Sequence, residues 1–303
     1  MTTPLPHPER TAPLEARGAT LYWDVLTGAD PVTEVHDDAL AADWLWDVPA
    51  AARELAYLTW AKAWWPTSVV AGVPPLDPAL LAAELAVAAA AVDHLLDDED
   101  AVERAVADAA AAVHPLAALA TDPVLGDAAS TLAARLADLA EDHGITLPDP
   151  VPAERERTGF ALAAGGTAGA EVVVLRGASP VDWALVPQGT VDAAADATWS
   201  VVRRDGGLVL AVSVPTLRPV PLAARFGEIE APLHDGTGQV TVPPSVLLLP
   251  AAQRTLTVYA PGFAEPEPET DPDAAARRAA LVAMARARLD APDATLTERA
   301  AAR

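Results

Sequence analysis

The sequence contains no cysteine, no asparagine and only one lysine, Lys62. Without cysteine, the chain cannot form disulfide bonds, thiolate metal sites or a cysteine nucleophile. Without asparagine, it has no acceptor for N-linked glycosylation. Any Schiff-base chemistry would have to use Lys62, because no other lysine side chain is present.

Long apolar segments are also absent, although 51% of the residues are hydrophobic. The most apolar run, residues 80–96, is interrupted by Glu84, Asp93 and His94, so it does not have the composition of a membrane-spanning helix. The first ten residues lack the basic segment and apolar core of a signal peptide. We therefore expect a cytoplasmic protein that does not bind membranes.

Positive charge is scarce, and the formal net charge is −23. Residues 1–150 contain 25 acidic and 6 basic residues, a net charge of −19. This field repels nucleic acid and anionic lipid, so neither is an expected partner. A protein or peptide partner with a basic surface is compatible with it.

Catalytic and cofactor-binding motifs are missing as well. The sequence has no Gly-x-Ser-x-Gly motif, no Gly-Lys-[Ser/Thr] phosphate loop and no closely spaced pair of histidines. The pairs His36–Asp37, Asp93–His94 and His234–Asp235 are interpreted as surface residues. We therefore predict no catalytic residue, no metal ion and no cofactor.

The stretch HLLDDEDAVER, residues 94–104, resembles the aspartate-rich helix of trans-isoprenyl and terpene synthases. That resemblance implies carboxylates one helical turn apart that bind Mg²⁺ and a diphosphate. Asp97 and Asp98 match the first two positions, but the third is Ala101, and the asparagine of the family's second metal motif is absent. We interpret residues 97–100 as a solvated turn that caps the neighbouring helices.

Hydrophobic periodicity divides the chain into two parts. Residues 39–143 have the spacing of alanine-rich helices, with Asp77 and Pro78 as a clear helix start. After the proline-rich residues 146–157, short alternating segments predict strands. The expected helices cover residues 39–48, 50–65, 76–96, 101–113 and 127–143, and the expected strands include residues 159–163, 170–176, 181–186, 197–204, 207–214, 221–226, 239–242, 245–249 and 255–260.

These patterns predict an α+β fold. It comprises an N-terminal β-hairpin with an alanine-rich helical bundle, a C-terminal antiparallel β-sandwich and a tethered C-terminal helix. The expected parts are a disordered tail (1–18), a hairpin and acidic helical module (19–145), a β-sandwich module (158–262), an acidic proline-rich linker (263–273), a C-terminal helix (274–289) and a frayed tail (290–303).

Two segments are candidates for partner binding. The first, residues 58–77, holds Trp60, Trp64 and Trp65. Tyr57, Trp60 and Trp64 share one helical face, which favours core packing, and Lys62 lies on the solvated side. A binding rim beside the Gly/Pro-rich loop that follows is the alternative.

The second candidate is the C-terminal helix, with the apolar residues Leu281 and Met284 and the flanking arginines Arg278 and Arg286. Its apolar side is too small to stabilise it alone in water, so it needs a surface to pack on. We expect that surface to be the acidic helical module or a partner. A non-catalytic interaction protein is the first functional hypothesis. The alternatives are a hydrolase or transferase with a carboxylate/His site between the modules, and a structural subunit of a larger assembly.

Overall fold

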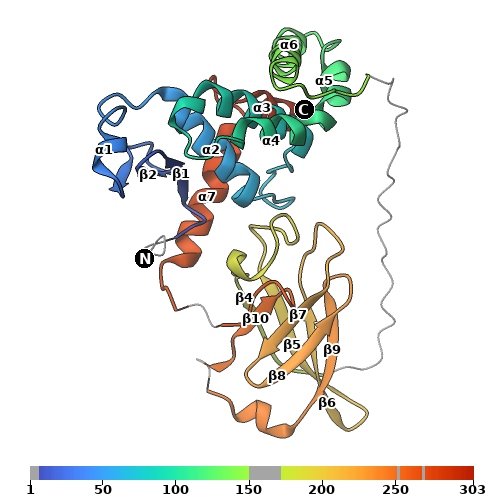
Figure 1. The fold of residues 1–303 in the computed structure, drawn as a ribbon. Helices are drawn as coiled ribbons and strands as arrows, with labels where there is room; N and C mark the ends of the chain where they lie inside the picture. Colours follow the sequence, from blue (N-terminus) through green and yellow to red (C-terminus); the bar gives the residue numbers. More distant parts are fainter. Residues whose placement is uncertain (1–6, 150–171, 251–252, 268–269) are drawn as a thin grey trace. The chain divides into compact units, whose positions relative to one another are not determined.

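The computed structural model confirms the predicted α+β class and its antiparallel sheets (Figure 1). It describes residues 7–149, 172–250, 253–267 and 270–303. The chain forms two compact units: unit 1 comprises residues 1–65, 74–156 and 284–303, and unit 2 comprises residues 66–73 and 157–283. The expected strand at 159–163 lies outside the described residues. The division differs from the expected modules at two segments. Residues 66–73 belong to unit 2 although they lie within the expected helical module, and residues 284–303 belong to unit 1 although a separate helix and tail were expected there.

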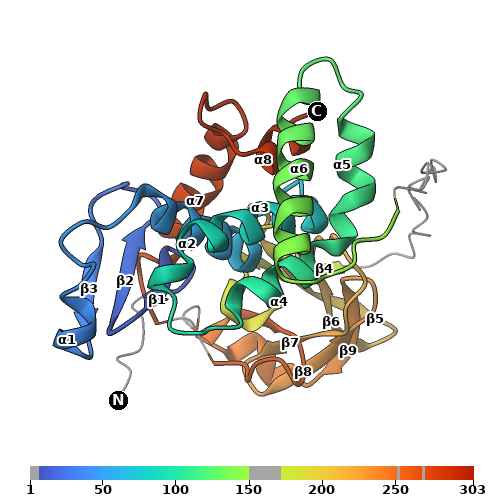
Figure 2. The same cartoon turned by 45° about the horizontal axis from the view of Figure 1, so that its top comes forward.

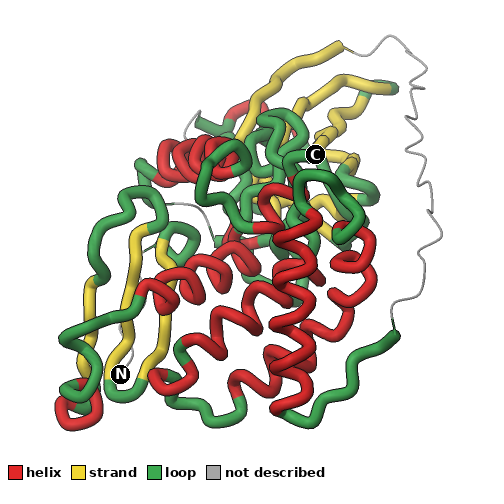
Figure 3. The backbone as a smooth tube through the Cα atoms, turned by 90° about the horizontal axis from the view of Figure 1, so that it is seen from above, coloured by secondary structure: helices red, strands yellow, loops and turns green. Residues whose placement is uncertain are grey.

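Unit 1 begins with an antiparallel three-stranded sheet (Figure 3). Its strands are β1 (Thr11–Ala16), β2 (Ala19–Asp24) and β3 (Val32–Val35), in that order. The expected hairpin is the β2–β3 pair. The prediction of a disordered tail is wrong for β1, which pairs with β2 along its whole length. Ala12, Leu14 and Ala16 are buried at alternate positions, a strand pattern that the prolines of this region concealed.

The helices of unit 1 follow this sheet, and α5 and α6 lie side by side (Figure 2). They are α1 (Asp38–Ala41), α2 (Ala50–Trp64), α3 (Pro78–Ala91), α4 (Ala101–Asp108), α5 (Val113–Leu119) and α6 (Gly126–Asp142), with the 3₁₀ turns η1 (Asp93–Leu95) and η2 (Ala109–Ala112). The Asp77 carboxylate accepts from the backbone N–H groups of Ala79 and Leu80, as the start signal predicted. Two expectations are wrong. The helix at 39–48 ends after one turn, and the helix at 101–113 is divided into α4 and η2 and is followed directly by α5, which holds Pro115 in its first turn, where the missing N–H removes no helical bond.

The C-terminal segment contains α7 (Ala274–Arg288) and α8 (Leu296–Ala301). The expected frayed tail at 290–303 is therefore wrong. The Glu84 carboxylate of α3 accepts from the backbone N–H groups of Leu296 (2.6 Å) and Thr297 (3.3 Å). Burial raises the pKa of Glu84, and these hydrogen bonds act in the opposite direction. Residues 284–303 pack in unit 1, so this part of the C-terminal segment docks within the chain.

Unit 2 contains two antiparallel sheets that share one core. The four-stranded sheet has the order β4 (Val172–Ser179), β5 (Ala197–Arg204), β6 (Gly207–Ser213), β9 (Thr237–Val242), and the three-stranded sheet has the order β10 (Leu256–Tyr259), β7 (Leu222–Phe226), β8 (Ile229–Leu233). Trp199 of the first sheet packs against Phe226 of the second, with ring centroids 4.6 Å apart. Aromatic and branched side chains from both sheets therefore close the core between them.

Three strand predictions in unit 2 need correction. Residues 181–186 and 245–249 form the 3₁₀ turns η3 (Trp183–Leu185) and η4 (Pro244–Leu248). Strand β8 was not predicted, because it has only five residues and contains Pro232, an unusual residue inside a strand. It lies at a sheet edge, where a proline is tolerated. Strands β5 and β6 are joined by a two-residue Asp-Gly turn, in which Asp205 and Gly206 have φ of 52° and 79°, as such a hairpin turn requires.

Residues 66–73 connect α2 and α3 but fold with unit 2. The Asp192 carboxylate, 3% exposed, accepts from the Ser68 hydroxyl (2.6 Å) and from the backbone N–H groups of Val69 (2.8 Å) and Val70 (3.2 Å). It also accepts from the backbone N–H of Ala194 at 3.0 Å. Burial acts to raise the pKa of Asp192, but the hydrogen bonds outweigh it and lower that pKa. One buried carboxylate thus holds the loop on unit 2.

Replacing Asp192 by alanine is expected to lower the free energy of unfolding by about 2–4 kcal/mol, because hydrogen bonds to a charged acceptor are strong and the buried Ser68 hydroxyl would lose its acceptor. The lowered pKa means that this stabilisation is present above the unfolded pKa of about 3.9 and is lost as the pH falls through the folded value. Urea unfolding at neutral and acidic pH tests both points. Asp196→Ala, at a nearby exposed carboxylate, is the control, and equal midpoints for the two variants would contradict the role of Asp192.

Among the described residues, every helix is too short or too polar to cross a lipid bilayer.

Candidate functional site

Unit 1 contains a groove of about 480 Å³, which we call the α2–α4 groove. Strand β1, three helices and the residue after η1 contribute to it. Its lining residues are Pro13, Leu14, Glu15, Leu55, Thr59, Lys62, Ala82, Leu85, Ala89, Leu96, Ala101, Arg104, Ala105 and Asp108. The volume lies within the range of ligand-binding clefts in proteins, about 300–1,000 Å³.

Helical periodicity builds the walls of the groove. Leu55, Thr59 and Lys62 follow one another at intervals of four and three residues, so they form a single stripe along α2. Positions 82, 85 and 89 form the same kind of stripe on α3, and positions 101, 104, 105 and 108 form one on α4. Alanine occupies several of these positions, and its small side chain leaves the concave space that a larger residue would fill.

The floor of the groove is apolar, and its charges lie at the rim. Leu14, Leu55 and Ala89 are buried in the floor. Thr59 brings a hydroxyl into the lining, and that hydroxyl already donates to the carbonyl oxygen of Leu55 at 2.8 Å. An apolar centre inside a polar rim is the arrangement of protein–protein interfaces.

Three of the four charged side chains that line the groove form ion pairs, and the fourth, Glu15, is exposed. Lys62 Nζ lies 3.9 Å from Asp108 Oδ2, and these side chains are 60% and 70% exposed. Arg104 forms an ion pair with Asp98. The solvated position predicted for Lys62 is therefore observed, and water screens its interaction with Asp108. Solvated, mutually paired charges of this kind do not make an activated nucleophile or a general base.

The acidic turn at residues 97–100 adjoins the groove, because Leu96 and Ala101 on either side of it both line the groove. The predicted capping role of these carboxylates is not observed at the start of α4. Asp98 accepts from the backbone N–H of Asp100 at 3.1 Å, but Asp100 makes no side-chain cap hydrogen bond to α4. The resemblance to a magnesium-binding helix is not supported, since α4 begins at Ala101, after the carboxylates.

The predicted tryptophan site is mostly interior. Trp60 and Trp65 are each 1% exposed, and their indole N–H groups donate to the carbonyl oxygens of Glu9 (2.8 Å) and Pro74 (2.9 Å). Trp64 is half-buried. Trp60 and Trp65 therefore serve the core of unit 1 and offer no surface to a partner. A binding role for Trp64 stays a prediction.

The predicted residues of the C-terminal helix do not form one surface. Leu281 is fully buried, and Arg278 is 7% exposed with Nη1 3.8 Å from Asp182 Oδ1 in unit 2. Met284 is half-buried and Arg286 is exposed. Leu281 and Arg278 therefore have structural surroundings within the chain, and the partner-binding role predicted for Met284 and Arg286 stays a prediction.

The residues of the α2–α4 groove were missed by the sequence analysis, apart from Lys62. In the sequence, the groove corresponds to a set of alanines at helical spacing, and the same spacing occurs throughout residues 79–140. Alanine at a concave surface and alanine at a close helix–helix contact give the same pattern, so periodicity alone cannot separate them.

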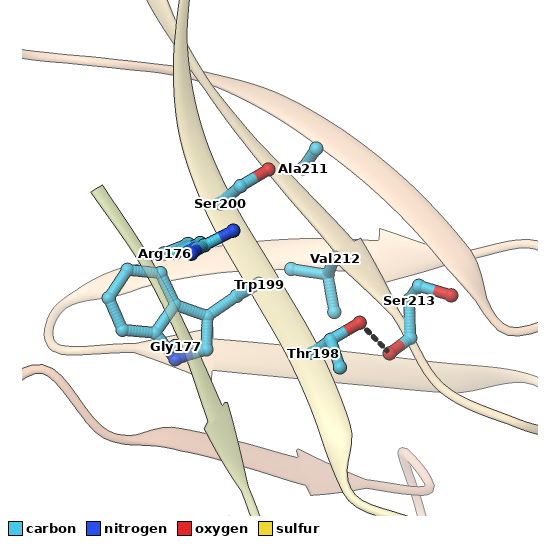
Figure 4. A pocket seen from close by; sticks show the side chains of 8 residues that line it. All are labelled: Arg176, Gly177, Thr198, Trp199, Ser200, Ala211, Val212 and Ser213. Atoms are coloured by element: carbon cyan, nitrogen blue, oxygen red, sulfur yellow. Dashed lines mark hydrogen bonds between the residues drawn. The ribbon is translucent and has the colours of Figure 1, made fainter. Parts of the chain in front are cut away.

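A second depression, of about 550 Å³, lies on the four-stranded sheet of unit 2 (Figure 4). It is lined by Arg176 and by small side chains such as Ser200, and the Trp199 ring passes under Gly177. A Cβ at position 177 would lie 2.6 Å from that ring, so glycine is required there. Trp199 faces the core, and apart from Arg176 the other side chains that line the depression are small, so it has fewer large apolar side chains than the α2–α4 groove.

Within residues 7–149, 172–250, 253–267 and 270–303, no three His, Asp or Glu side chains gather closely enough to hold a metal ion. Asp93 and His94 are the first two residues of η1 and are both exposed, and His234 lies in the exposed turn between β8 and β9. This part of the chain therefore offers the α2–α4 groove as the clearest candidate site.

No protein-family model, no curated protein and no solved structure matches this chain.

Proposed function

We propose that this protein is a non-catalytic binding protein that receives a segment of a protein partner in the α2–α4 groove. The observation that carries the proposal is the groove's apolar floor within a rim of solvated charges. Small-molecule sites usually have several polar groups that converge on the ligand and orient it. Here the charges stay at the rim, which suits the apolar anchor residues of a peptide better than a small polar substrate.

The β1 strand at the edge of the groove limits how a partner can bind. Pro13 lines the groove and has no backbone N–H to donate, so continuous pairing of an added strand with β1 is interrupted. Binding through side chains that enter the groove is therefore favoured over extension of the sheet. The proposal includes the cytoplasmic location expected from the sequence.

The test uses short random peptides displayed on phage and selected on the full-length protein. Selected peptides are synthesised, and their affinities are measured for the wild type and for two variants of α4. Ala105→Trp fills the groove, whereas Ala107→Trp places the same ring on an exposed position of the same helix. We expect Ala105→Trp to weaken binding by about tenfold or more, a loss of about 1.4 kcal/mol, and Ala107→Trp to leave it unchanged.

Circular dichroism must show that both tryptophan variants keep the helical content of the wild type. Ala101→Trp, at another lining position, replaces Ala105→Trp if the latter does not fold. The proposal fails if no peptide is selected, or if the selected peptides bind the groove-filled variant as tightly as the wild type.

A further inference from the structure

The α2–α4 groove has two ends that differ in charge. Along α4, Ala101 marks one end and Asp108 the other, about 10 Å apart at 1.5 Å per residue. The end at Asp108 also carries Lys62, so its charges balance. The end at Ala101 adjoins the turn formed by Asp97, Asp98, Glu99 and Asp100, which we call the acidic turn.

The acidic turn carries more negative charge than its neighbours neutralise. Asp98 is paired with Arg104, which also attracts Asp100, but the side chains of Asp97, Glu99 and Asp100 make no hydrogen bond or close ion pair within the described part of the chain. All three are exposed, so they are accessible to a partner. Like charges this close repel one another, and a bound cation relieves that repulsion.

Capping of α4 does not account for these carboxylates, since Asp100 makes no side-chain cap hydrogen bond. Metal binding does not account for them either, because no three acidic side chains in the described residues are placed to hold an ion. A ligand that fills the apolar groove and places positive charge over the acidic turn would contact both the groove and these carboxylates.

We infer that the segment bound in the α2–α4 groove belongs to a protein partner and carries arginine or lysine at the end that lies over the acidic turn, next to the apolar residues that enter the groove. This inference rests on the proposed function and adds the chemistry and the orientation of the ligand. The net charge of −19 over residues 1–150 acts in the same direction, since it attracts a basic segment from a distance.

The experiment uses peptides selected as above whose binding depends on Ala105. Each is synthesised with its basic end intact and with that end changed to serine, and binding is followed by fluorescence anisotropy. At about 50 mM salt we expect the basic form to bind about tenfold more tightly, and at about 500 mM salt we expect most of that difference to disappear.

Two triple variants with the same change of net charge locate the effect. Asp97→Asn, Glu99→Gln and Asp100→Asn together neutralise the acidic turn, and we expect them to remove the preference for the basic form while the serine form still binds. Asp138→Asn, Glu141→Gln and Asp142→Asn neutralise three exposed carboxylates of α6 and should leave the preference intact. All six positions are exposed, so neither variant is expected to unfold.

The results separate the two proposals. Groove-dependent peptides that lack arginine and lysine, or a preference that survives neutralisation of the acidic turn, would overturn the inference and leave the proposed function standing. If no selected peptide depends on Ala105, the inference and the proposed function both fail.

Discussion

Replacing Glu298 by alanine is expected to lower the free energy of unfolding by about 3–5 kcal/mol, the usual cost of removing one partner of a buried ion pair. Glu298 is 1% exposed. Its Oε1 accepts from the Tyr57 hydroxyl at 2.5 Å and from Arg288 Nε at 3.1 Å, and its Oε2 accepts from Arg288 Nη2 at 2.7 Å. Without this carboxylate, the Arg288 guanidinium and the Tyr57 hydroxyl both lose a buried acceptor.

The same carboxylate also organises the start of α8. Glu298 Oε2 accepts from the backbone N–H of Thr295 at 2.8 Å, and the Thr295 hydroxyl accepts from the backbone N–H of Glu298, which completes a capping box. Burial, followed by the charge of Glu298, raises the pKa of Tyr57, so that hydroxyl remains a donor at neutral pH. Arg288 also lies over the Tyr57 ring, 5.5 Å from its centroid.

Asp293→Ala is the matched control, because Asp293 accepts from Arg288 Nη1 at 2.9 Å but is 77% exposed. Its loss is expected to cost only about 0–1 kcal/mol, as for other solvated ion pairs. Urea unfolding followed by circular dichroism measures both variants, and hydrogen exchange over residues 284–303 shows whether the C-terminal segment is released. Equal stabilities for the two variants would show that Glu298 does not anchor this segment.

Replacing Trp60 by alanine is expected to cost about 3–5 kcal/mol, the range for deletion of a large buried aromatic side chain. The Trp60 ring is 1% exposed and stacks on Tyr57, with centroids 5.7 Å apart. Its deletion opens a cavity on α2 and leaves the carbonyl oxygen of Glu9 without the indole donor. Trp60→Phe keeps most of the ring volume and should lose a smaller part of this stability.

Trp46→Ala provides the control for Trp60. Trp46 is 80% exposed, so its removal is expected to change the free energy of unfolding by no more than about 0.5 kcal/mol. Thermal and urea unfolding, followed by circular dichroism, compare the variants without relying on tryptophan fluorescence. If Trp60→Ala kept the stability of the wild type but lost the binding of groove-dependent peptides, the core interpretation would be wrong and the binding interpretation of residues 58–77 would be correct.

Local chemistry allowed several elements to be predicted closely. Helix α3 begins where Asp77 and Pro78 place its start, and α2 covers residues 50–64 of the predicted 50–65. Helix start signals act within one turn, so they can be read without knowledge of the rest of the fold. Strand β1 was not predicted, because its own residues carry only weak strand signals. Its structure depends on pairing with β2, which a local pattern does not show.

The candidate site could be predicted only in part. The sequence identified Lys62 as a solvated residue and the acidic turn as a solvated cluster, because charge and helical position are local properties. It did not show that both lie at one groove, since that depends on how α2, α3 and α4 pack together with β1. Alanine spacing alone is compatible with many packings of these helices.

By itself, the sequence determined the acidic character of the protein, the chemistries that missing residues exclude, the α+β class and the positions of the best-capped helices. These properties follow from composition and from interactions within a few residues. Only the tertiary structure decided that Asp192 holds the loop at Ser68, that Glu84 and Tyr57 hold α8, and that the α2–α4 groove exists. Asp192 and Ser68 are 124 residues apart, and Tyr57 and Glu298 are 241 residues apart. Such contacts form because burial of the whole core brings residues together that are distant in the sequence. A carboxylate buried in this way is stable only with hydrogen-bond donors around it, and those donors come from any part of the chain that lies nearby.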